Sequence, residues 1–191
     1  MNTLLRLWRG FQARPWLPWL LDGLLLCLLA GWVVKPMFRM DYWQNWGSIE
    51  ATFIADARFL NENWPHPRWQ PNWYLGTRFD FIYPPALRYG TAWIARTFGL
   101  LPVRAYHIYV CLFFCLGIAG VYLFTRTLSR SRIAAWGAAL ATLLVSPTFV
   151  FLKANRDDAL DWMPQRLWAL MRYGEGPHIS ALALIPIALL F

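Results

Sequence analysis

The sequence predicts an all-helical polytopic membrane protein, and three observations support this prediction. Hydrophobic residues make up 58% of the chain and charged residues only 15%, whereas a soluble domain has about 25% charged residues. The apolar residues gather in blocks long enough to cross a hydrocarbon layer of roughly 30 Å, which takes about 20 residues of helix. The 13 Trp and 8 Tyr residues are typical of the aromatic belts at the two surfaces of a membrane.

Four apolar blocks are expected to form transmembrane helices. The first follows a basic N-terminal segment and lacks a small-residue cleavage site, so we interpret it as a retained helix rather than a signal peptide. The fourth block stops inside a helical pattern, which indicates an N-terminal piece of a longer protein. The blocks comprise residues 16–34, 105–124, 133–152 and 179–191.

The arginines predict the orientation of these helices. Residues 1–15 and 125–132 together contain six Arg and no acid, which places both segments in the cytoplasm. Residues 36–104 and 153–178 then form external segments. Residues 85–101 are apolar but contain two Arg, and we expect a re-entrant or surface helix here. If this segment crossed the membrane, the arginines of residues 125–132 would lie outside the cytoplasm. The net charge of +8 follows from this pattern and does not indicate nucleic-acid binding.

The first external segment has two halves of different character. Residues 41–60 place apolar side chains at helical spacing, which predicts an amphipathic helix lying along the membrane surface. Asp56 and Arg58 lie largely off that apolar stripe. Residues 61–85 are rich in Pro, Trp and Gly and are expected to be irregular. The apolar stripe consists of Tyr42, Trp46, Ile49, Phe53 and Leu60.

Asp41 is the first candidate for chemistry, because it follows the first helix at the expected boundary between water and lipid. A carboxylate there could act as a general base on an acceptor hydroxyl, or hold a divalent cation. Asp41 would also serve as the N-cap of the following helix, and the two roles are compatible.

The Trp- and Pro-rich run that begins at Asn63 is the most distinctive stretch. Arg68 and Arg78 are candidates for pairing with phosphate, and Trp69 and Tyr83 are candidates for stacking on sugar rings or anchoring at headgroups. The same residues would also suit a rigid interfacial plug that binds no ligand.

The second external segment contains further candidates. Arg156 could hold phosphate, and Asp157 and Asp158 could complete a metal or acid–base site with Asp41, although a solvated loop with a helix cap explains the acids too. Glu175 and His178 flank a glycine-bracketed turn before the fourth helix. They are candidates for substrate contact, and a plain helix-entry turn is equally compatible with them.

Other polar or reactive residues are given structural roles. The three Cys residues lie in apolar blocks with neither disulfide nor zinc spacing. His66 and His107 have no ligand-like partners nearby in the sequence, which favours surface or packing roles. Asp22 is costly inside a membrane and suggests a function, unless it faces the headgroups near the cytoplasmic end of its helix.

Several of these features together resemble the GT-C glycosyltransferase superfamily, and within it the bacterial membrane family labelled 6-pyruvoyl-tetrahydropterin-synthase-related, a label that implies no pterin chemistry. The resemblance covers about residue 36 to the end. It rests on an early Asp, a surface helix, a Trp-Pro stretch, a Gly turn, a Pro-Pro motif and a later Gly-Glu-Gly-Pro-His turn. These are Asp41, Trp64–Pro71, Gly76, Phe81–Pro85 and Gly174–His178.

The resemblance implies a GT-C-like helix bundle in the bacterial cytoplasmic membrane. Such enzymes transfer a sugar from a polyprenyl-phosphate donor to an acceptor on the outer face. Asp41 matches the catalytic Asp of the superfamily, and Asp157 or Asp158 a second acidic position. Asp41 lacks the adjacent acid of some branches, which leaves open whether Mg²⁺ or Mn²⁺ binds at Asp41 and Asp157. The sugar, the acceptor and the oligomeric state are not indicated.

Two alternatives belong to other functional classes. A transporter or flippase of lipid-linked glycans would use the same basic and aromatic surface, but would depend on charge within the helices, where only Asp22 is available. A non-catalytic membrane scaffold would use the Trp-Pro loop to dock a partner, and would tolerate replacement of the acids.

Overall fold

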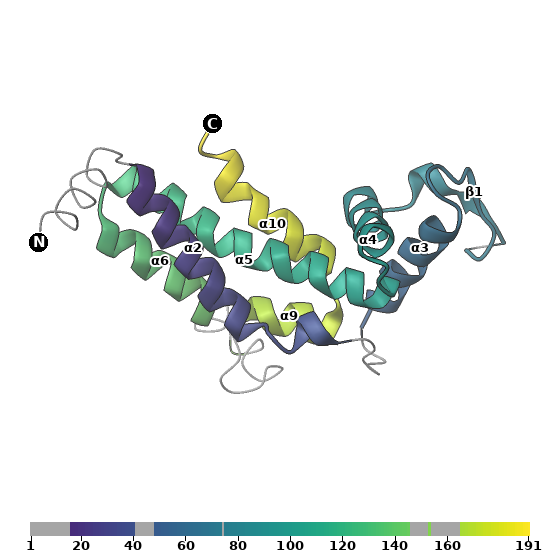
Figure 1. Ribbon diagram of the computed structural model, residues 1–191, viewed down its shortest axis with the longest axis horizontal. Coiled ribbons are helices and arrows are strands. Elements are labelled where there is room, and N and C mark those ends of the chain that lie inside the picture. Colours follow the sequence, from purple (N-terminus) through teal and green to yellow (C-terminus); the bar gives the residue numbers. More distant parts are fainter. Residues whose placement is uncertain (1–15, 41–47, 74, 146–152, 154–164) are drawn as a thin grey trace, which may run out of the picture.

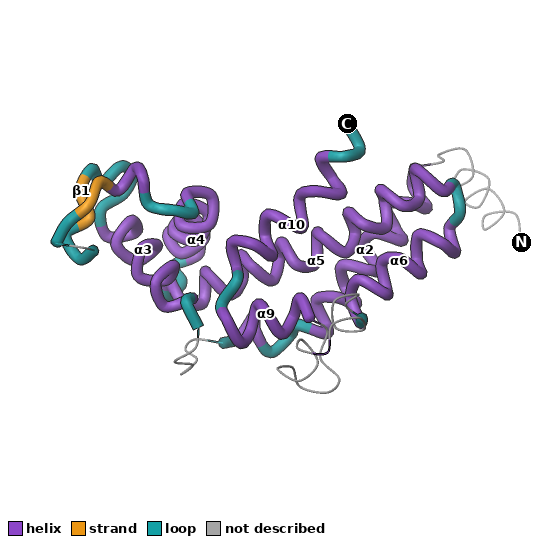
Figure 2. Tube along the Cα trace, turned by 180° about the vertical axis from the view of Figure 1, so that it is seen from behind, coloured by secondary structure: helices purple, strands orange, loops and turns teal. Residues whose placement is uncertain are grey.

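The protein consists of an apolar helix bundle and a smaller unit at one end of it (Figure 1). The computed structural model describes residues 16–40, 48–73, 75–145, 153 and 165–191. Helices dominate this part of the chain, and the strands form one short hairpin (Figure 2). The bundle contains α2 (Trp16–Val33), α5 (Pro102–Ser129), α6 (Arg132–Leu144) and α10 (Gly176–Ala188). The smaller unit contains α3 (Glu50–Glu62), β1 (Trp69–Gln70), β2 (Thr77–Arg78), η2 (Phe79–Phe81) and α4 (Pro85–Phe98).

Helix α5 is the centre of the bundle and packs against α2, α6 and α10. Its neighbour α2 runs antiparallel, because Asp22 meets Tyr122 near one end and Met40, after η1 (Met37–Arg39), meets His107 at the other. Helix α10 runs in the same direction as α5 and lies along its glycines. A Cβ on Gly117 would lie 3.0 Å from the Cα of Ala183, so the small residues allow the two helices to pack closely here.

The helix boundaries differ from the expected ones in ways that have local causes. Helix α5 extends from Pro102 to Ser129, so it includes most of the segment expected as a cytoplasmic loop, 125–132. Pro102 begins the helix because a proline at the first helical position loses no intrahelical hydrogen bond. The chain then turns sharply through Arg130, which has a φ of 55°, and Ser131 caps α6 by accepting a hydrogen bond from the Ala134 amide.

Helices α3, α6 and α10 also begin or end at other residues than the sequence predicts. The helix expected over 41–60 spans Glu50–Glu62, and residues 41–47 lie outside the described part. Helix α6 ends at Leu144, whereas the prediction extended to 152, and residues 146–152 are likewise outside. The last helix begins at Gly176 rather than 179. The short α9 (Gln165–Tyr173) lies in the expected second external segment.

Two buried acids correct the expected polar face of α3. Phe53 and Leu60 are buried as the stripe predicts, but Asp56 and Glu50 are buried as well, with exposed fractions of 1% and 7%. Asp56 lies inward because α4 and the hairpin cover that face of the helix. Helix α4 packs against α3, and the hairpin pairs Trp69 with Arg78, where an irregular segment was expected.

Two of the described helices, α2 and α5, are long and apolar enough to cross a membrane, judged by length and composition, while α6 and α10 are apolar but shorter. Many apolar side chains of α2 are exposed; Leu28 and Trp32, for example, have exposed fractions of 62% and 72%. A core helix of a soluble protein would bury such residues, so the exposed surface of α2 favours membrane association.

Candidate functional site

Polar side chains converge where the smaller unit meets the bundle. We call this place the junction and define it by Glu50 at the start of α3, Tyr106 and His107 in the first turns of α5, and the Gly174–Glu175 turn before α10. The Ile49 amide donates a hydrogen bond of 3.0 Å to the Tyr173 carbonyl, which ties the start of α3 to the end of α9.

His107 is fully buried at the junction, with an exposed fraction of 0%. Its Nδ1 lies 2.8 Å from the carbonyl oxygen of Met40. A carbonyl can only accept, so Nδ1 carries a proton and donates this hydrogen bond. Nε2 lies 3.5 Å from Oε2 of Glu50. The ring therefore connects the end of η1 with the start of α3.

The Gly174–Gly176 turn fits closely between α3 and α5. The Tyr106 hydroxyl donates a hydrogen bond of 3.2 Å to the Gly174 carbonyl. Gly174 has a φ of 71°, and a Cβ there would lie 2.6 Å from the Glu50 amide nitrogen. A Cβ on Gly176 would lie 2.8 Å from Val110. Both glycines are therefore required by close packing, and this packing brings Glu175 to the junction.

The side chains of Glu175 and His178 are in direct hydrogen-bond contact at the start of α10, between Oε2 and Nδ1. His178 is mostly exposed, with 66% of its side chain accessible, and Glu175 is about one-third exposed at 32%. The pair thus presents an acid and an imidazole at the surface of the junction. These two residues were predicted as candidates from the sequence, and the structure places them on the same turn that packs against Glu50.

The remaining predicted acids are not described. Asp41 directly follows Met40, whose carbonyl contacts His107, but Asp41 itself lies outside the described residues, as do Arg156, Asp157 and Asp158. A metal site of Asp41 and Asp157 therefore stays a prediction. Within the described ranges, no three or more His, Cys, Asp or Glu side chains are grouped closely enough to hold a metal on their own.

The basic and aromatic candidates form a second, separate set. Trp69 and Arg78 are paired across the hairpin, and Arg68, Trp69, Arg78 and Tyr83 are all exposed. Arg78 forms an ion pair of 3.3 Å with Asp80. Figure 1 shows the hairpin at the outer end of the smaller unit, away from the start of α10. The fold does not bring this set together with Glu175 and His178.

A buried polar cluster holds the hairpin on α3 and α4. Asp56 accepts hydrogen bonds from Trp73 Nε1 at 3.1 Å and Gln70 Nε2 at 3.4 Å. Arg88 is 2% exposed and lies 4.1 Å above the Phe79 ring. Burial raises the pKa of Asp56, although both hydrogen bonds and the charge of Arg88 oppose the rise. Burial likewise lowers the pKa of Arg88.

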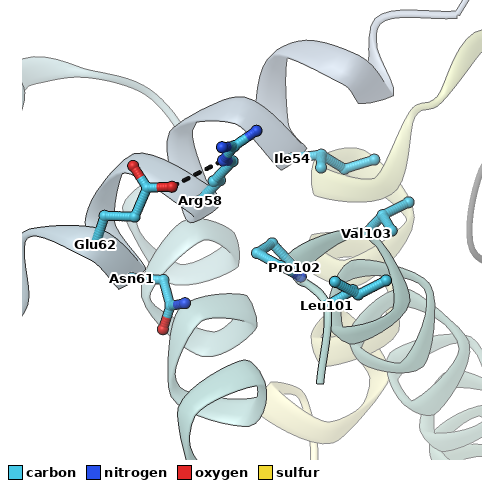
Figure 3. A pocket seen from close by; sticks show the side chains of 7 residues that line it. All are labelled: Ile54, Arg58, Asn61, Glu62, Leu101, Pro102 and Val103. Carbon is cyan, nitrogen blue, oxygen red and sulfur yellow. Dashed lines mark hydrogen bonds and ion pairs between the residues drawn. The ribbon is translucent and has the colours of Figure 1, made fainter. Parts of the chain in front are cut away.

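A cavity of about 490 Å³ lies between α3 and the start of α5. Figure 3 shows Arg58 and Glu62, which form an ion pair of 2.8 Å, on its α3 side opposite Leu101 and Pro102. The apolar floor and charged rim of this cavity were not predicted from the sequence. Its full lining is Ile54, Arg58, Asn61, Glu62, Leu101, Pro102 and Val103.

Asp22 occupies the opposite end of the bundle and is buried, with an exposed fraction of 1%. It accepts two hydrogen bonds from the Arg132 guanidinium, at 2.8 and 2.7 Å, and one of 2.5 Å from the Tyr122 hydroxyl. Asp22 therefore faces Tyr122 and Arg132 within the bundle. The carboxylate joins α2, α5 and α6, because a buried charge requires a paired and hydrogen-bonded environment.

Sequence reasoning missed Glu50 and His107 as site residues. His107 was assigned a surface or packing role because no partner lies near it in the sequence, and Glu50 is one acid on an amphipathic helix. Their proximity depends on how α3 packs against α5. The one local signal was the position of Glu50 in a first helical turn, where the helix dipole favours an acid.

Comparisons with known proteins add no family to this picture. No protein-family model, no curated protein and no solved structure matches the chain.

Proposed function

We propose that the chain belongs to a membrane-embedded glycosyltransferase that transfers a sugar from a polyprenyl-phosphate-linked donor to an acceptor at the extracytoplasmic face. The observation that carries the proposal is the junction. Glu50 and His107 link the turn that carries Glu175, and with it His178, to Met40. The residue after Met40 is Asp41, the proposed general base. An acid–base set at the end of a long apolar helix suits a hydroxyl acceptor that meets a lipid-borne donor.

The bundle supports a multi-pass arrangement in a bacterial cytoplasmic membrane. Helices α2 and α6 run one way and α5 and α10 the other, so successive apolar helices alternate in direction. Arg126, Arg130 and Arg132 lie at the end of the bundle opposite the junction, which agrees with a cytoplasmic position for them. The N-terminus is then cytoplasmic, and the junction and the α3–α4 unit are external.

The proposed roles follow from position. Asp41 removes the proton from the acceptor hydroxyl, while Glu175 and His178 contact the substrate at the start of α10. Arg156 holds the donor phosphate, and Asp157 or Asp158 supplies a second acidic group. Arg68, Trp69, Arg78 and Tyr83 lie on or next to the outer hairpin, so we assign them to the surface over which the substrate approaches, where Arg pairs with phosphate and aromatic rings stack on sugars.

The alternatives receive less support from the described residues. Transport of a lipid-linked glycan would require a charge within the helices that responds to the substrate, and Asp22 is already paired with Arg132 and Tyr122. A scaffold would dock a partner through the Trp-Pro loop. Trp69 is 54% exposed, but its ring packs on Gly76, which gives it a structural role within the hairpin.

The test compares bacterial membranes that carry the full-length natural protein with membranes that carry Asp41→Asn or Glu175→Gln. Lipid-linked and surface glycans are measured by mass spectrometry, and protein amount and insertion are measured in the same samples. Glu62→Gln is the matched control, because Glu62 is an exposed acid of the smaller unit. We expect Asp41→Asn to lower the glycan product by about 10²–10⁴-fold, because general-base catalysis is lost. The product should persist with Glu62→Gln.

Two results would count against the proposal. If Asp41→Asn leaves the product unchanged while the protein remains inserted, Asp41 is a helix cap and the base lies elsewhere or is absent. If the natural protein itself changes no glycan, the chain is not a glycosyltransferase of this class.

A further inference from the structure

Three arginines lie at the end of the bundle farthest from the α3–α4 unit, where α5 ends and α6 begins. Arg126 lies in the last turn of α5, Arg130 follows the end of that helix, and Arg132 is the first residue of α6. Arg126 donates a hydrogen bond to the Arg130 carbonyl, so its guanidinium lies beside the turn. Figure 1 shows the start of α2 at the same end. We call these three residues the arginine turn.

The positive charge of the arginine turn is only partly offset by the helices around it. Helices α2, α5 and α6 contain a single acid between them, Asp22, and its carboxylate pairs with Arg132 at 2.7 Å. Arg126 and Arg130 therefore carry two charges that no carboxylate of these three helices balances. Arg130 is exposed, and the Arg132 side chain stays 64% exposed despite its ion pair. An anion from outside the chain can reach this surface.

The backbone at Arg130 supports a role for its side chain. Arg130 has a φ of 55°, a left-handed conformation that favours glycine because a residue with a Cβ is strained there. Glycine is the usual residue where a helix ends with this geometry. An arginine at this position strains the turn, and its side chain is exposed rather than part of the core. Its charge is therefore the property that explains its presence.

The surroundings indicate that the anion belongs to a membrane lipid. The Arg126 guanidinium lies 5.3 Å over the Trp19 ring, and Trp16, in the first turn of α2, is 52% exposed. Trp side chains are enriched at the level of the lipid headgroups. Helix α5 is also long and apolar enough to span a membrane, with the arginine turn at its end. An arginine fork matches two oxygens of a phosphate group, and basic groups at the ends of membrane helices bind anionic headgroups.

We propose that the arginine turn binds the headgroup of an anionic phospholipid such as phosphatidylglycerol, with Arg126 and Arg130 contacting its phosphate. The site prefers an anionic to a zwitterionic headgroup, because the two unbalanced cations attract a net negative charge and a zwitterion carries none. The site requires that α5 spans the membrane. It does not depend on the proposed sugar transfer, whose residues lie at the opposite end of the bundle.

The test measures lipid binding by the full-length protein, purified in a non-ionic detergent. Native mass spectrometry compares the binding of phosphatidylglycerol with that of phosphatidylcholine at equal concentration, and we expect tighter binding of phosphatidylglycerol. Arg126→Gln and Arg130→Gly should each weaken phosphatidylglycerol binding about fivefold, the effect of one basic residue near an anionic lipid surface. Arg130→Lys keeps the charge and should retain most of the affinity. Arg58→Gln is the matched control, because Arg58 is an exposed arginine of α3.

The glycine variant also protects the test against misfolding. Because glycine relieves the strained φ, Arg130→Gly should have a thermal midpoint equal to or above that of the natural protein while its lipid preference falls. Equal affinity of the natural protein for the two lipids, or an equal loss in Arg58→Gln, would overturn the proposal. Unchanged phosphatidylglycerol affinity in both Arg126→Gln and Arg130→Gly would also overturn it. Displacement of the lipid by inorganic phosphate at equal concentration would do the same, because a soluble anion would then be the ligand.

Discussion

At the scale of single residues, Asp56 shows how this chain tolerates a buried charge. Its carboxylate is 1% exposed, yet it receives hydrogen bonds from Trp73 and Gln70 and lies near Arg88. The balance still disfavours the ionised form, because the cost of burial is the largest influence on its pKa. The native fold therefore holds the Asp56 proton more tightly than the unfolded chain does.

This balance predicts a pH dependence of stability. A carboxyl group whose pKa is raised in the folded state stabilises the fold below its unfolded pKa of about 3.9. That contribution is lost as pH rises through the folded pKa, because the unfolded chain releases the proton first. We expect the thermal midpoint of the natural protein, relative to Asp56→Asn, to fall as pH increases from about 3.5 towards 7, since asparagine does not ionise. Unfolding in detergent can be followed by far-ultraviolet circular dichroism of the helices, a signal that does not depend on a pH-sensitive labelling reaction.

Glu62→Gln is the control for the pH series, because Glu62 is an exposed acid on the same helix. Its difference from the natural protein should show no comparable fall. A natural protein that gains stability over Asp56→Asn as pH rises would mean that Arg88 outweighs burial and that the pKa of Asp56 is lowered.

The same residue marks the limit of sequence reasoning at this scale. The helical stripe correctly predicted that Phe53 and Leu60 are buried. It assigned Asp56 to the polar face because periodicity describes one helix and one solvent, whereas two other elements cover that face. Glu50 and His107 were missed for the same reason, since a contact between distant helices leaves no local pattern. Glu175 and His178 were found because their signal, a glycine-bracketed turn, is contained in a few residues.

At the scale of elements, the Gly174 turn determines how α9, α3 and α10 meet. Its φ of 71° lies in the left-handed region, which costs a residue with a Cβ about 1–2 kcal/mol. The close approach of the Glu50 amide, 2.6 Å from the position of a Cβ, adds a steric cost that cannot be relieved by a side-chain movement. Position 174 therefore requires glycine for two separate reasons, its backbone conformation and its close packing.

Gly174→Ala should therefore destabilise the protein by more than the backbone cost alone. Gly99→Ala provides the comparison, because Gly99 has a φ of 63° but no atom of the described residues within 4 Å of a Cβ. Gly137→Ala lies within α6, where the described residues also leave open space, and should be neutral or stabilising by about 1 kcal/mol. We expect thermal midpoints in the order Gly137→Ala, Gly99→Ala, Gly174→Ala, from highest to lowest. Equal midpoints for the last two would show that the contact with Glu50 relaxes without cost.

The elements were predicted to different degrees for physical reasons. The first block, expected over 16–34, became α2 over Trp16–Val33, because a continuous apolar run between breaking residues has few other structures available. The ends of α5 were missed, because Pro102 and the turn at Arg130 extend the helix beyond its apolar part. The hairpin was missed because two strands of two residues have no recognisable alternation.

At the scale of the whole molecule, one chemical asymmetry runs along the bundle. At one end Asp22 is enclosed by Tyr122 and Arg132, and Arg126 lies over the Trp19 ring at 5.3 Å. At the other end the α3–α4 unit extends from the bundle (Figure 1). Arginines at a bundle end are expected on the cytoplasmic side. The Asp22–Arg132 pair then holds α2 and α6 together close to that surface.

This asymmetry predicts which end of the molecule faces outward. In a version whose native cysteines are replaced by alanine, Asn72→Cys places a thiol on the exposed loop of the hairpin, and Ser129→Cys places one at the exposed end of α5. A membrane-impermeant maleimide added to intact spheroplasts should label Asn72→Cys within minutes and leave Ser129→Cys unlabelled. Permeabilised membranes should label both, which serves as the accessibility control.

The result distinguishes the possible arrangements because each labels the two sites differently. Labelling of Ser129→Cys alone in intact spheroplasts would reverse the orientation and place the junction in the cytoplasm, where an extracytoplasmic transfer reaction is excluded. Labelling of both sites in intact spheroplasts would mean that α5 does not cross the membrane, despite 28 residues of helix. The predicted pattern requires α5 to cross the membrane, so that Asn72 lies outside the cell and Ser129 in the cytoplasm. The arginines next to Ser129 are then cytoplasmic, as the positive-inside rule predicts.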